Sequence, residues 1–594
     1  MEDGASIGRL RALRGALRGA VRDHAGPFAV LLALATFLCA PILGDPTGRA
    51  LGHPSNDVWN HVWGFWWVAT ELAAGRLPVT TNLLAWPAGG SLWFIDTFNV
   101  IATLPVAFLA GPVAAYNAAI FGNFVLCGVG AYVLALRVAR SRAGATLAGV
   151  AFMSCPHLLG QAYNGISETL SAGWLPLALA AFLAAREAPR AGRAALAGAA
   201  FGVCAFANWY YGLFAAMVIG AVLAWDLVGA VRGRSPREWR LGDTRRAVLS
   251  LAIAGGVAAL VAGGPFTLFY LSMGAADAVV TRDRAFVWMT LVMHNMTDLV
   301  SLVRPGKHYS PDLKAQFDED LLVIVYLGHA LVWPALATVW GGWRRFARPW
   351  ALFAGAFVLL TLGPFLYVAG AYVEVGGQWI PLPFLTLFDA FPLFSRISHA
   401  YRFVVGASLA LAVMLAWVVR DLGQRGIPVV AAAAWLGAMR LVEALWLSPA
   451  VFPLPTADTR VPEVYATLDG GAVLDLPVSL PVLARSRYGM YQIVHGQPVP
   501  YGLNDPSPLY LYVNRYTRYL IELERSTIAV LPVEMPMLDL ALGQQDLRDR
   551  GLRWIVLHRA EYPAAQYAKV AQLLDLTATP TWDDGTTRVY RIGP

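Results

Sequence analysis

The stretch Ser55-Asn56-Asp57-Val58-Trp59-Asn60-His61-Val62-Trp63-Gly64-Phe65-Trp66-Trp67 follows the first hydrophobic span, near 28–43. Its tryptophans recur at helical spacing and share one face: Trp59, Trp63, Trp66 and Trp67. A helix with such a face, just outside a membrane span, fits the headgroup layer of a bilayer. Asp57 opens this helix. The sequence therefore predicts a carboxylate at the membrane surface, where an enzyme acting on a lipid-borne substrate needs an acid or a base.

The composition places the whole chain in a membrane. Its 594 residues are 57% hydrophobic and only 14% charged, with a mean hydropathy of +0.53, whereas a soluble chain carries roughly 25% charged residues. The net charge of +7 comes from short arginine clusters between apolar stretches, a pattern typical of topology control rather than of nucleic-acid binding. We expect an all-α polytopic membrane protein with no nucleic-acid partner.

Arginine placement orients the spans. The basic N-terminus precedes a span without a clear cleavage site, so we place it in the cytoplasm as a retained start. Five further basic segments are placed on the same side: 137–142, 186–193, 232–246, 344–348 and 420–425. About eleven spans fit between them, near 28–43, 116–136, 144–157, 170–185, 194–208, 212–231, 247–271, 321–341, 350–370, 402–419 and 427–448. An odd count puts the C-terminus outside.

Two consequences follow for domain organisation. The apolar stretch 101–111 is too short to span, so we treat it as juxtamembrane or re-entrant. The transmembrane domain covers 1–448, with outer loops at about 44–115, 272–320 and 371–401. After 449 charged residues increase and long apolar runs end. Strand patterns at 472–478, 554–558 and 587–592, with a helical pattern at 563–574, predict a small extracytoplasmic α/β domain over 449–594.

Three acids on the outer side are candidates for chemistry. Asp57 is a candidate general base, with His61 one helical turn later as a substrate contact. The alternative is that Asp57, with its neighbours Ser55 and Asn56, only caps the helix. Glu168 stands at the outer start of a span, where an ionisable group is costly and marks function unless it is a solvated loop acid. Asp96 lies among aromatic residues and is either a substrate contact or a turn residue.

Two cationic elements face outward, against the general rule that positive charge stays inside. Arg304, Lys307 and His308 form the first, in the loop 272–320, and Arg396 and Arg402 form the second, before a span. Arginine and lysine suit phosphate binding. The alternative is anchoring to anionic lipid headgroups.

The sequence predicts no cofactor. The run Asp318-Glu319-Asp320 matches a DxD pattern that can hold a divalent ion, but a solvated acidic run before a span explains it as well. The four cysteines lie in or beside apolar stretches without metal-ligand spacing and are interpreted as buried hydrophobes. Nucleotide-binding motifs and a cytoplasmic nucleotide-binding domain are missing from the sequence, which disfavours ATP-driven transport.

Several blocks together resemble the GT-C-type membrane glycosyltransferases, the superfamily of the protein O-mannosyltransferases and the lipid A aminoarabinose transferases. The outer loop with an acid heading an aromatic helix is the first block. The others are Asn82-Leu83-Leu84-Ala85-Trp86-Pro87-Ala88-Gly89-Gly90-Ser91, Leu109-Ala110-Gly111-Pro112-Val113-Ala114-Ala115-Tyr116-Asn117, Trp174-Leu175-Pro176-Leu177, Phe391-Pro392-Leu393-Phe394-Ser395-Arg396 with Arg402-Phe403, and Gly551-Leu552-Arg553-Trp554-Ile555-Val556-Leu557-His558.

The resemblance implies an inverting sugar transfer from a polyprenyl-phosphate donor on the outer face of a bacterial cytoplasmic membrane. An acid of the first outer loop is then the general base, a position that Asp57 occupies, and Glu168 is the second acid. The chain departs from the Asp-Glu pair of the O-mannosyltransferases by having Asn56-Asp57. The acceptor can be a glycan, a lipid or a protein. The competing hypothesis is a non-catalytic lipid or polysaccharide transporter or assembly scaffold, but the inverted repeats and broken helices of transporters are not found in the sequence.

Overall fold

The computed structural model describes residues 22–231, 241–305, 321–503, 508–528, 530–532 and 534–592. Within these residues, seven helical segments are long and apolar enough to cross a membrane. They are Thr97–Ala139, Arg142–Asn164, Ser167–Glu187, Trp209–Gly229, Arg245–Gly274, Ala400–Gln424 and Val429–Leu447. The chain is a helical multi-pass membrane protein, and the predicted count of eleven spans is not confirmed.

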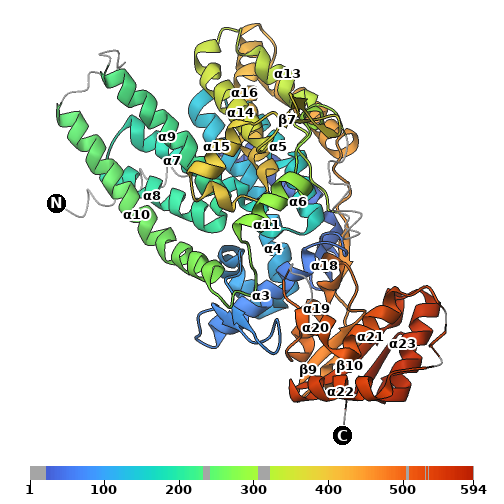
Figure 1. The fold of residues 1–594 in the computed structure, drawn as a ribbon. Helices are drawn as coiled ribbons and strands as arrows, with labels where there is room; N and C mark the ends of the chain where they lie inside the picture. Colours follow the sequence, from blue (N-terminus) through green and yellow to red (C-terminus); the bar gives the residue numbers. More distant parts are fainter. Residues whose placement is uncertain are drawn as a thin grey trace, which may run out of the picture.

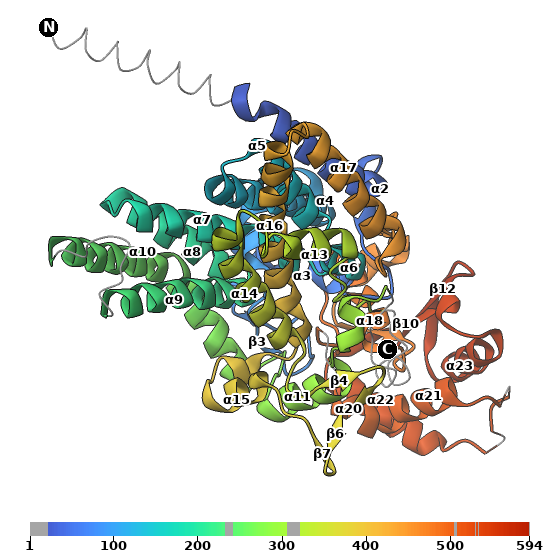
Figure 2. The ribbon, with the colours of Figure 1, turned by 90° about the horizontal axis from the view of Figure 1, so that it is seen from above.

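The helices form a packed centre and a projecting layer. The centre consists of α4 (Thr97–Ala139), α5 (Arg142–Met153) and α16 (Val404–Gln424), which contact one another. The layer projects to one side in Figure 2 and consists of α7 (Trp174–Glu187), α8 (Ala191–Ala207), α9 (Trp209–Val231) and α10 (Leu241–Gly274). Most of α16 is buried, whereas α10 is largely exposed although it is apolar. An exposed apolar helix of this length is one that a bilayer can cover.

The apolar stretch 101–111 is not a separate element. It forms the first part of α4, whose two helical pieces meet at Gly111. Gly111 has φ +85°, a left-handed value that a residue with a side chain rarely adopts. The helix therefore changes direction there, and Pro112 begins its second piece.

The predicted span 321–341 is wrong in its first part. Residues 322–327 are buried but not helical, and the helix α13 (His329–Ala337) has only nine residues. Backbone groups in such a position must find partners inside the protein. Asn164 donates to the Leu322 carbonyl and accepts from its N–H, both at 2.8 Å. Glu443 accepts the N–H groups at the start of α13 at 2.6 and 2.9 Å. Buried polar side chains thus replace the hydrogen bonds that a helix would have made.

Three other predicted spans differ in length. The span 194–208 is α8, with 17 residues, and the span 350–370 is α14 (Arg344–Thr361), which ends nine residues early. The first span is a helix from 22 to 38 that continues into α2 (Ala40–Leu43). The remaining membrane-side helices are α6 (Pro156–Asn164), η1 (Ser167–Gly173), α17 (Val429–Val442) and η6 (Glu443–Leu447).

Short elements connect the helices and carry most of the polar candidates. The first connection holds β1 (Arg49–Leu51), α3 (Val58–Ala73), β2 (Thr80–Thr81) and β3 (Gly90–Ser91). Later connections hold α11 (Arg284–Met289), η2 (Thr290–His294), η3 (Leu299–Leu302), β4 (Tyr367–Val368), β5 (Ala371–Tyr372), β6 (Glu374–Val375), β7 (Gln378–Trp379), α15 (Pro383–Ala390), η4 (Phe394–Arg396) and η5 (Ala400–Phe403).

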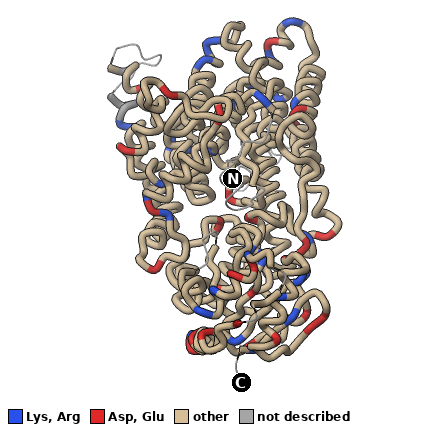
Figure 3. Tube along the Cα trace, turned by 45° about the vertical axis from the view of Figure 1, so that its right-hand side comes forward, with Lys and Arg blue, Asp and Glu red and all other residues tan. Residues whose placement is uncertain are grey.

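The C-terminal part, drawn in orange and red in Figure 1, is built around a four-stranded sheet whose strand order is β11-β12-β10-β9. Its strands are β9 (Ala472–Leu476), β10 (Leu552–His558), β11 (Thr579–Asp583) and β12 (Thr587–Arg591), and only β9 and β10 run parallel. Its helices and short elements are β8 (Thr456–Asp458), η7 (Glu463–Thr467), α18 (Val482–Arg485), α19 (Arg487–His495), α20 (Leu509–Val513), α21 (Arg515–Arg525), α22 (Met537–Asp549), η8 (Arg559–Glu561) and α23 (Ala564–Thr577). Charged positions are dense around this part in Figure 3. Its extracytoplasmic location stays a prediction.

Candidate active site

A cavity of about 940 Å³ lies where the first connection, the layer α9–α10 and the C-terminal part meet. Acids, cations and apolar side chains from across the sequence line it together. Its charged and amide side chains include Asp57, Asn60, His61, Glu168, Arg282, Asn295, Arg396 and Arg402. The cavity therefore brings together five of the residues that the sequence predicts as catalytic or substrate-binding: Asp57, His61, Glu168, Arg396 and Arg402.

Asp57 opens α3, but its side chain does not cap the helix. It lines the cavity instead, half-buried, and its Oδ1 accepts a hydrogen bond of 2.8 Å from Asn60 Nδ2. The backbone N–H of Asp57 donates to the Asn164 carbonyl at 3.0 Å, which fixes the start of α3 against α6. The capping alternative is not supported for the Asp57 side chain, which makes no cap hydrogen bond and lines the cavity.

The tryptophan face of α3 does not lie in the headgroup layer. Trp59, Trp63 and Trp67 are at most 1% exposed, and only Trp66 is partly exposed. Trp63 Nε1 donates to Gln492 Oε1 of α19 at 2.7 Å. The face is therefore covered by the C-terminal part of the same chain, a contact that the local pattern of residues could not show.

His61 lies at the centre of a buried charge cluster. Its Nε2 is 3.4 Å from Glu168 Oε2, and its Nδ1 is 2.9 Å from Ser167 Oγ. Ser167 in turn donates its hydroxyl hydrogen to Asp96. Burial alone would lower the pKa of His61, but the interaction with Asp96 and the charges of Glu168, Asp57 and Asp96 raise it to about 9. We therefore expect His61 to be an imidazolium at neutral pH.

Asp96 lies on the side of His61 that faces away from the cavity, with its Oδ2 3.9 Å from His61 Nδ1. It is fully buried, accepts a 2.6 Å hydrogen bond from Asn99 Nδ2, and does not line the cavity. Burial raises the pKa of this carboxyl group, against the opposing effects of His61 and Ser167. The prediction of a direct substrate contact is not supported by this placement, because His61 and Ser167 stand between Asp96 and the cavity.

Glu168 and Arg402 form a buried pair in the cavity wall. Glu168 is 2% exposed, so it is not the solvated loop acid of the alternative interpretation. Its Oε1 is 3.5 Å from Arg402 Nη1, and the Arg402 guanidinium lies 5.1 Å from the centre of the Tyr210 ring. Arg402 is 7% exposed. A buried charge persists when it is paired, and Glu168 sits between two cationic groups, His61 and Arg402.

The other predicted cations separate into two groups. Arg396 is exposed, lines the cavity, and donates from Nη1 to the backbone carbonyl of Arg282 at 2.9 Å. Arg304 is exposed at the end of η3 and does not line the cavity. Lys307, His308 and the run Asp318-Glu319-Asp320 lie outside the described residues.

No protein-family model matches the chain, and no curated protein matches it significantly. Solved structures do. The arabinofuranosyltransferase AftD from Mycobacteria matches 96% of this chain with a TM-score of 0.55 at 13% sequence identity. The archaeal oligosaccharyltransferase AglB from Archaeoglobus fulgidus, in complex with an inhibitory peptide and a dolichol-phosphate, matches 96% with a TM-score of 0.52 at 11% identity. The chain has the GT-C glycosyltransferase fold.

The similarity concerns the fold, and its extent differs between the two proteins. The match covers 74% of AglB but only 40% of AftD. At identities of 11% and 13%, the roles of single residues have to be argued from this chain's own cavity.

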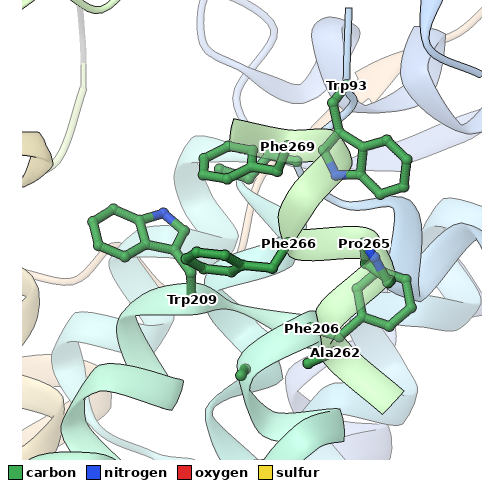
Figure 4. A pocket seen from close by; sticks show the side chains of 9 residues that line it. Trp93, Phe206, Trp209, Ala262, Pro265, Phe266 and Phe269 are labelled. Carbon is green, nitrogen blue, oxygen red and sulfur yellow. The ribbon is translucent and has the colours of Figure 1, made fainter. Parts of the chain in front are cut away.

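Within the GT-C fold, the cavity has an apolar side that the sequence did not reveal. Aromatic side chains from three helices and the first connection converge there (Figure 4). They border a smaller hollow lined by Trp93, Ile95, Ala205, Phe206, Trp209, Ala262, Pro265, Phe266 and Phe269. Five of these residues also line the main cavity: Trp93, Ile95, Trp209, Phe266 and Phe269.

Sequence reasoning missed several polar residues of the cavity, Asn60 and Arg282 among them. Asn60 donates a hydrogen bond to Asp57. It could have been found from its place three residues after Asp57, in the first turn of the same helix. Arg282 lies in Thr281-Arg282-Asp283-Arg284, within a predicted outer loop, and nothing local separates it from Arg284. Among the described residues, no group of three His, Cys, Asp or Glu side chains is arranged to hold a metal ion.

Proposed function

We propose that this chain transfers a sugar from a polyprenyl-phosphate donor to an acceptor hydroxyl, on the extracytoplasmic side of a bacterial cytoplasmic membrane. The observation that carries the proposal is the single cavity in which one half-buried carboxylate, Asp57, shares its space with three arginines, Arg282, Arg396 and Arg402. A base and an anion-binding group in one cavity are what sugar transfer from a phosphate leaving group requires.

Asp57 is the proposed general base. Its carboxylate lines the cavity, and Asn60 Nδ2 donates a hydrogen bond to its Oδ1. The acceptor oxygen attacks the anomeric carbon as the bond from that carbon to the phosphate oxygen breaks. The acceptor proton passes to Asp57, and polyprenyl phosphate leaves with the bonding electrons. A single displacement of this kind inverts the anomeric configuration.

The arginines are the proposed phosphate-binding groups. Arg402 is positioned by Glu168 and Tyr210, so its guanidinium is oriented before substrate arrives. The Arg396 guanidinium donates a hydrogen bond to the backbone carbonyl of Arg282, and the two arginines add charge nearer the solvent. Positive charge fixed in this way stabilises the phosphate as it becomes the leaving group, and we propose that no resident metal ion is needed.

The aromatic side of the cavity is the proposed contact for the polyprenyl chain. Trp209, Phe266 and Phe269 border both the polar cavity and the apolar hollow (Figure 4). They belong to α9 and α10, and α10 is an exposed apolar helix that lipid can cover. A donor whose phosphate meets the arginines can thus leave its chain on an apolar surface that continues toward lipid. The acceptor can be a glycan, a lipid or a protein.

Substitution of Asp57 tests the proposal. In Asp57→Asn the side chain keeps its shape and can still accept from Asn60, but it cannot take the acceptor proton. Turnover should fall by about 10²–10⁴-fold while donor binding persists. The measurement is release of undecaprenyl phosphate from a panel of undecaprenyl-phosphate sugars by protein in lipid nanodiscs.

The matched control is Glu71→Gln, a second acid on α3 that pairs with Arg76 and does not line the cavity. It should leave turnover unchanged. Near-normal transfer by Asp57→Asn would end the case for Asp57 as base. Failure of the wild type to release polyprenyl phosphate from any donor of the panel, with glycan, lipid and peptide acceptors supplied, would end the case for sugar transfer.

A further inference from the structure

The C-terminal part holds the first connection at three places. β1 pairs with β8 in an antiparallel register from Arg49 opposite Asp458 to Leu51 opposite Thr456. Backbone hydrogen bonds of 2.9–3.1 Å join residues 83–86 to residues 499–501. α19 packs against α3, and Figure 1 shows the two helices side by side. The helix that begins at Asp57 is therefore held between the membrane helices and the C-terminal part.

Gln492 is the polar centre of this contact. Its side chain is fully buried, and its Oε1 accepts the hydrogen bond from Trp63 Nε1 at 2.7 Å. Its Nε2 donates to the Leu83 carbonyl at 2.7 Å and to the Gln497 carbonyl at 2.9 Å. Both amide hydrogens and the amide oxygen are thus used. One side chain links α3, the first connection and the C-terminal part.

The same contact is apolar and tightly packed around Gln492. The Trp63 and Trp67 rings are stacked, with centroids 5.5 Å apart. A Cβ atom at Gly489 of α19 would lie 3.4 Å from the Trp63 ring, an ordinary van der Waals distance, so the two helices are in direct contact there. At the other end of the interface, the Arg487 guanidinium lies 5.8 Å from the Trp59 ring centroid. Trp59 is two residues from Asp57, so the contact extends to the residue that carries the proposed chemistry.

We infer that Gln492 is a positioning residue for α3: through Trp63 and Leu83 it fixes the helix that presents Asp57 and His61 to the cavity. This inference rests on the proposed function for its catalytic consequence, although not for the contact itself. The C-terminal part is on this account a component of the active site and not an appended binding module. The physical reason is that a reacting group displaced by about 1 Å can lose ~10²-fold in rate.

Gln492→Leu tests the inference because it keeps the volume and removes all three hydrogen bonds. The matched control is Gln544→Leu in the same part of the chain. Gln544 is 7% exposed and donates to the Thr577 carbonyl at 2.8 Å, within the C-terminal part. Both variants remove a buried glutamine, but only the first touches α3.

Hydrogen exchange of the full chain in nanodiscs gives a readout that needs no substrate. Exchange in the peptide 58–73 should rise about tenfold in Gln492→Leu and stay at the wild-type rate in Gln544→Leu, since one lost buried hydrogen bond is worth on the order of a tenfold change in an opening equilibrium. Trp63→Phe should also raise the rate, and adding Gln492→Leu to it should have less than its full effect, because only the link through Leu83 then remains to be lost. Equal exchange in both glutamine variants, or additive effects with Trp63→Phe, would overturn the positioning role.

Turnover then tests the catalytic consequence. In Gln492→Leu kcat should fall by about tenfold or more with the donor KM within about twofold of wild type, because the phosphate-binding arginines are not displaced. Gln544→Leu should keep the wild-type kcat. Faster exchange in α3 with an unchanged kcat would refute the catalytic role alone. A wild type that releases no polyprenyl phosphate would refute the proposed function, while the exchange rates would still decide the contact.

Discussion

Two buried histidines in different parts of the molecule have similar neighbours. His61, in the cavity wall, is 4% exposed and lies beside a hydroxyl group, Ser167, and the carboxylates Glu168 and Asp96. His558, at the end of β10, is 6% exposed, and its Nε2 is 2.9 Å from the Tyr465 hydroxyl and 3.0 Å from Asp475 Oδ1. Each histidine therefore has a hydroxyl group and a carboxylate beside it, a combination of residue types that is typical of catalytic centres.

The surroundings separate them. The His558 ring is stacked against tyrosines, with centroids 5.6 Å from Tyr488 and 5.1 Å from Tyr491, and no member of its group lines the cavity. His61 faces the cavity, and Arg402 lies across Glu168 from it. The comparison teaches that access and the balance of charges define the candidate site, because the histidine–carboxylate–hydroxyl arrangement occurs in both places.

Among the effects that bear on this comparison, the largest should come from the buried pair in the cavity wall, Arg402 and Glu168. Arg402→Gln removes the cation proposed to stabilise the leaving phosphate, and loss of one such group costs about 10²–10³-fold in kcat. It also leaves Glu168 with one cationic neighbour fewer, so the free energy of unfolding should fall by several kcal/mol, roughly 3–5. The measurements are undecaprenyl phosphate release and thermal unfolding of the purified protein.

The double variant Arg402→Gln/Glu168→Gln separates the two effects. It removes both buried charges, so most of the stability should return while kcat stays low. Asp475→Asn is the control from the His558 group: it should lower stability and leave kcat of the folded protein unchanged. Recovery of kcat together with stability in the double variant would show that Arg402 acts only on folding.

The next effect is a pH dependence of stability that comes from His61. Its pKa is raised from 6.5 to about 9 in the folded protein. The contribution of His61 to stability is therefore fully present below about pH 6.5 and is lost as the pH rises through about 9. The melting temperature of the wild type should fall between pH 7 and 10, and that of His61→Gln should change less over this range. Parallel curves for the two proteins would contradict the charged state of His61.

The site residues that the sequence predicts are those whose surroundings are set by neighbouring residues in the chain. Asp57, Glu168 and Arg402 were recognisable because an ionisable residue next to a span is a local feature. Arg282 was not, because only the tertiary fold distinguishes it from Arg284. The burial of the tryptophan face depends on Gln492, 429 residues away from Trp63 in sequence.

The fold shows the same division. Apolar length gave the helices α4, α5, α9, α10, α16 and α17 their approximate places. It failed at 321–341, because a short apolar run can be a buried extended segment or a helix with the same composition. Hydrogen bonds with Asn164 and Glu443 stabilise the non-helical segment 322–327 and the start of α13, and both residues lie far from this segment in sequence.

The smallest effect concerns two exposed arginines. It tests whether a solvent-exposed arginine contributes to donor binding when it lines the cavity. Arg396 lines the cavity and Arg304 does not. Arg396→Gln should raise the donor KM by about fivefold, since a solvent-screened ion pair is worth up to about 1 kcal/mol, and the rise should shrink with added salt. Arg304→Gln should leave the donor KM unchanged, because its guanidinium is outside the cavity. If both arginines serve only to anchor the protein to anionic headgroups, the two variants should instead lower binding to anionic vesicles equally and leave both KM values at that of the wild type. An equal rise in KM for both variants would mean that Arg304 reaches the donor in solution and that the cavity boundary drawn at Arg396 is wrong.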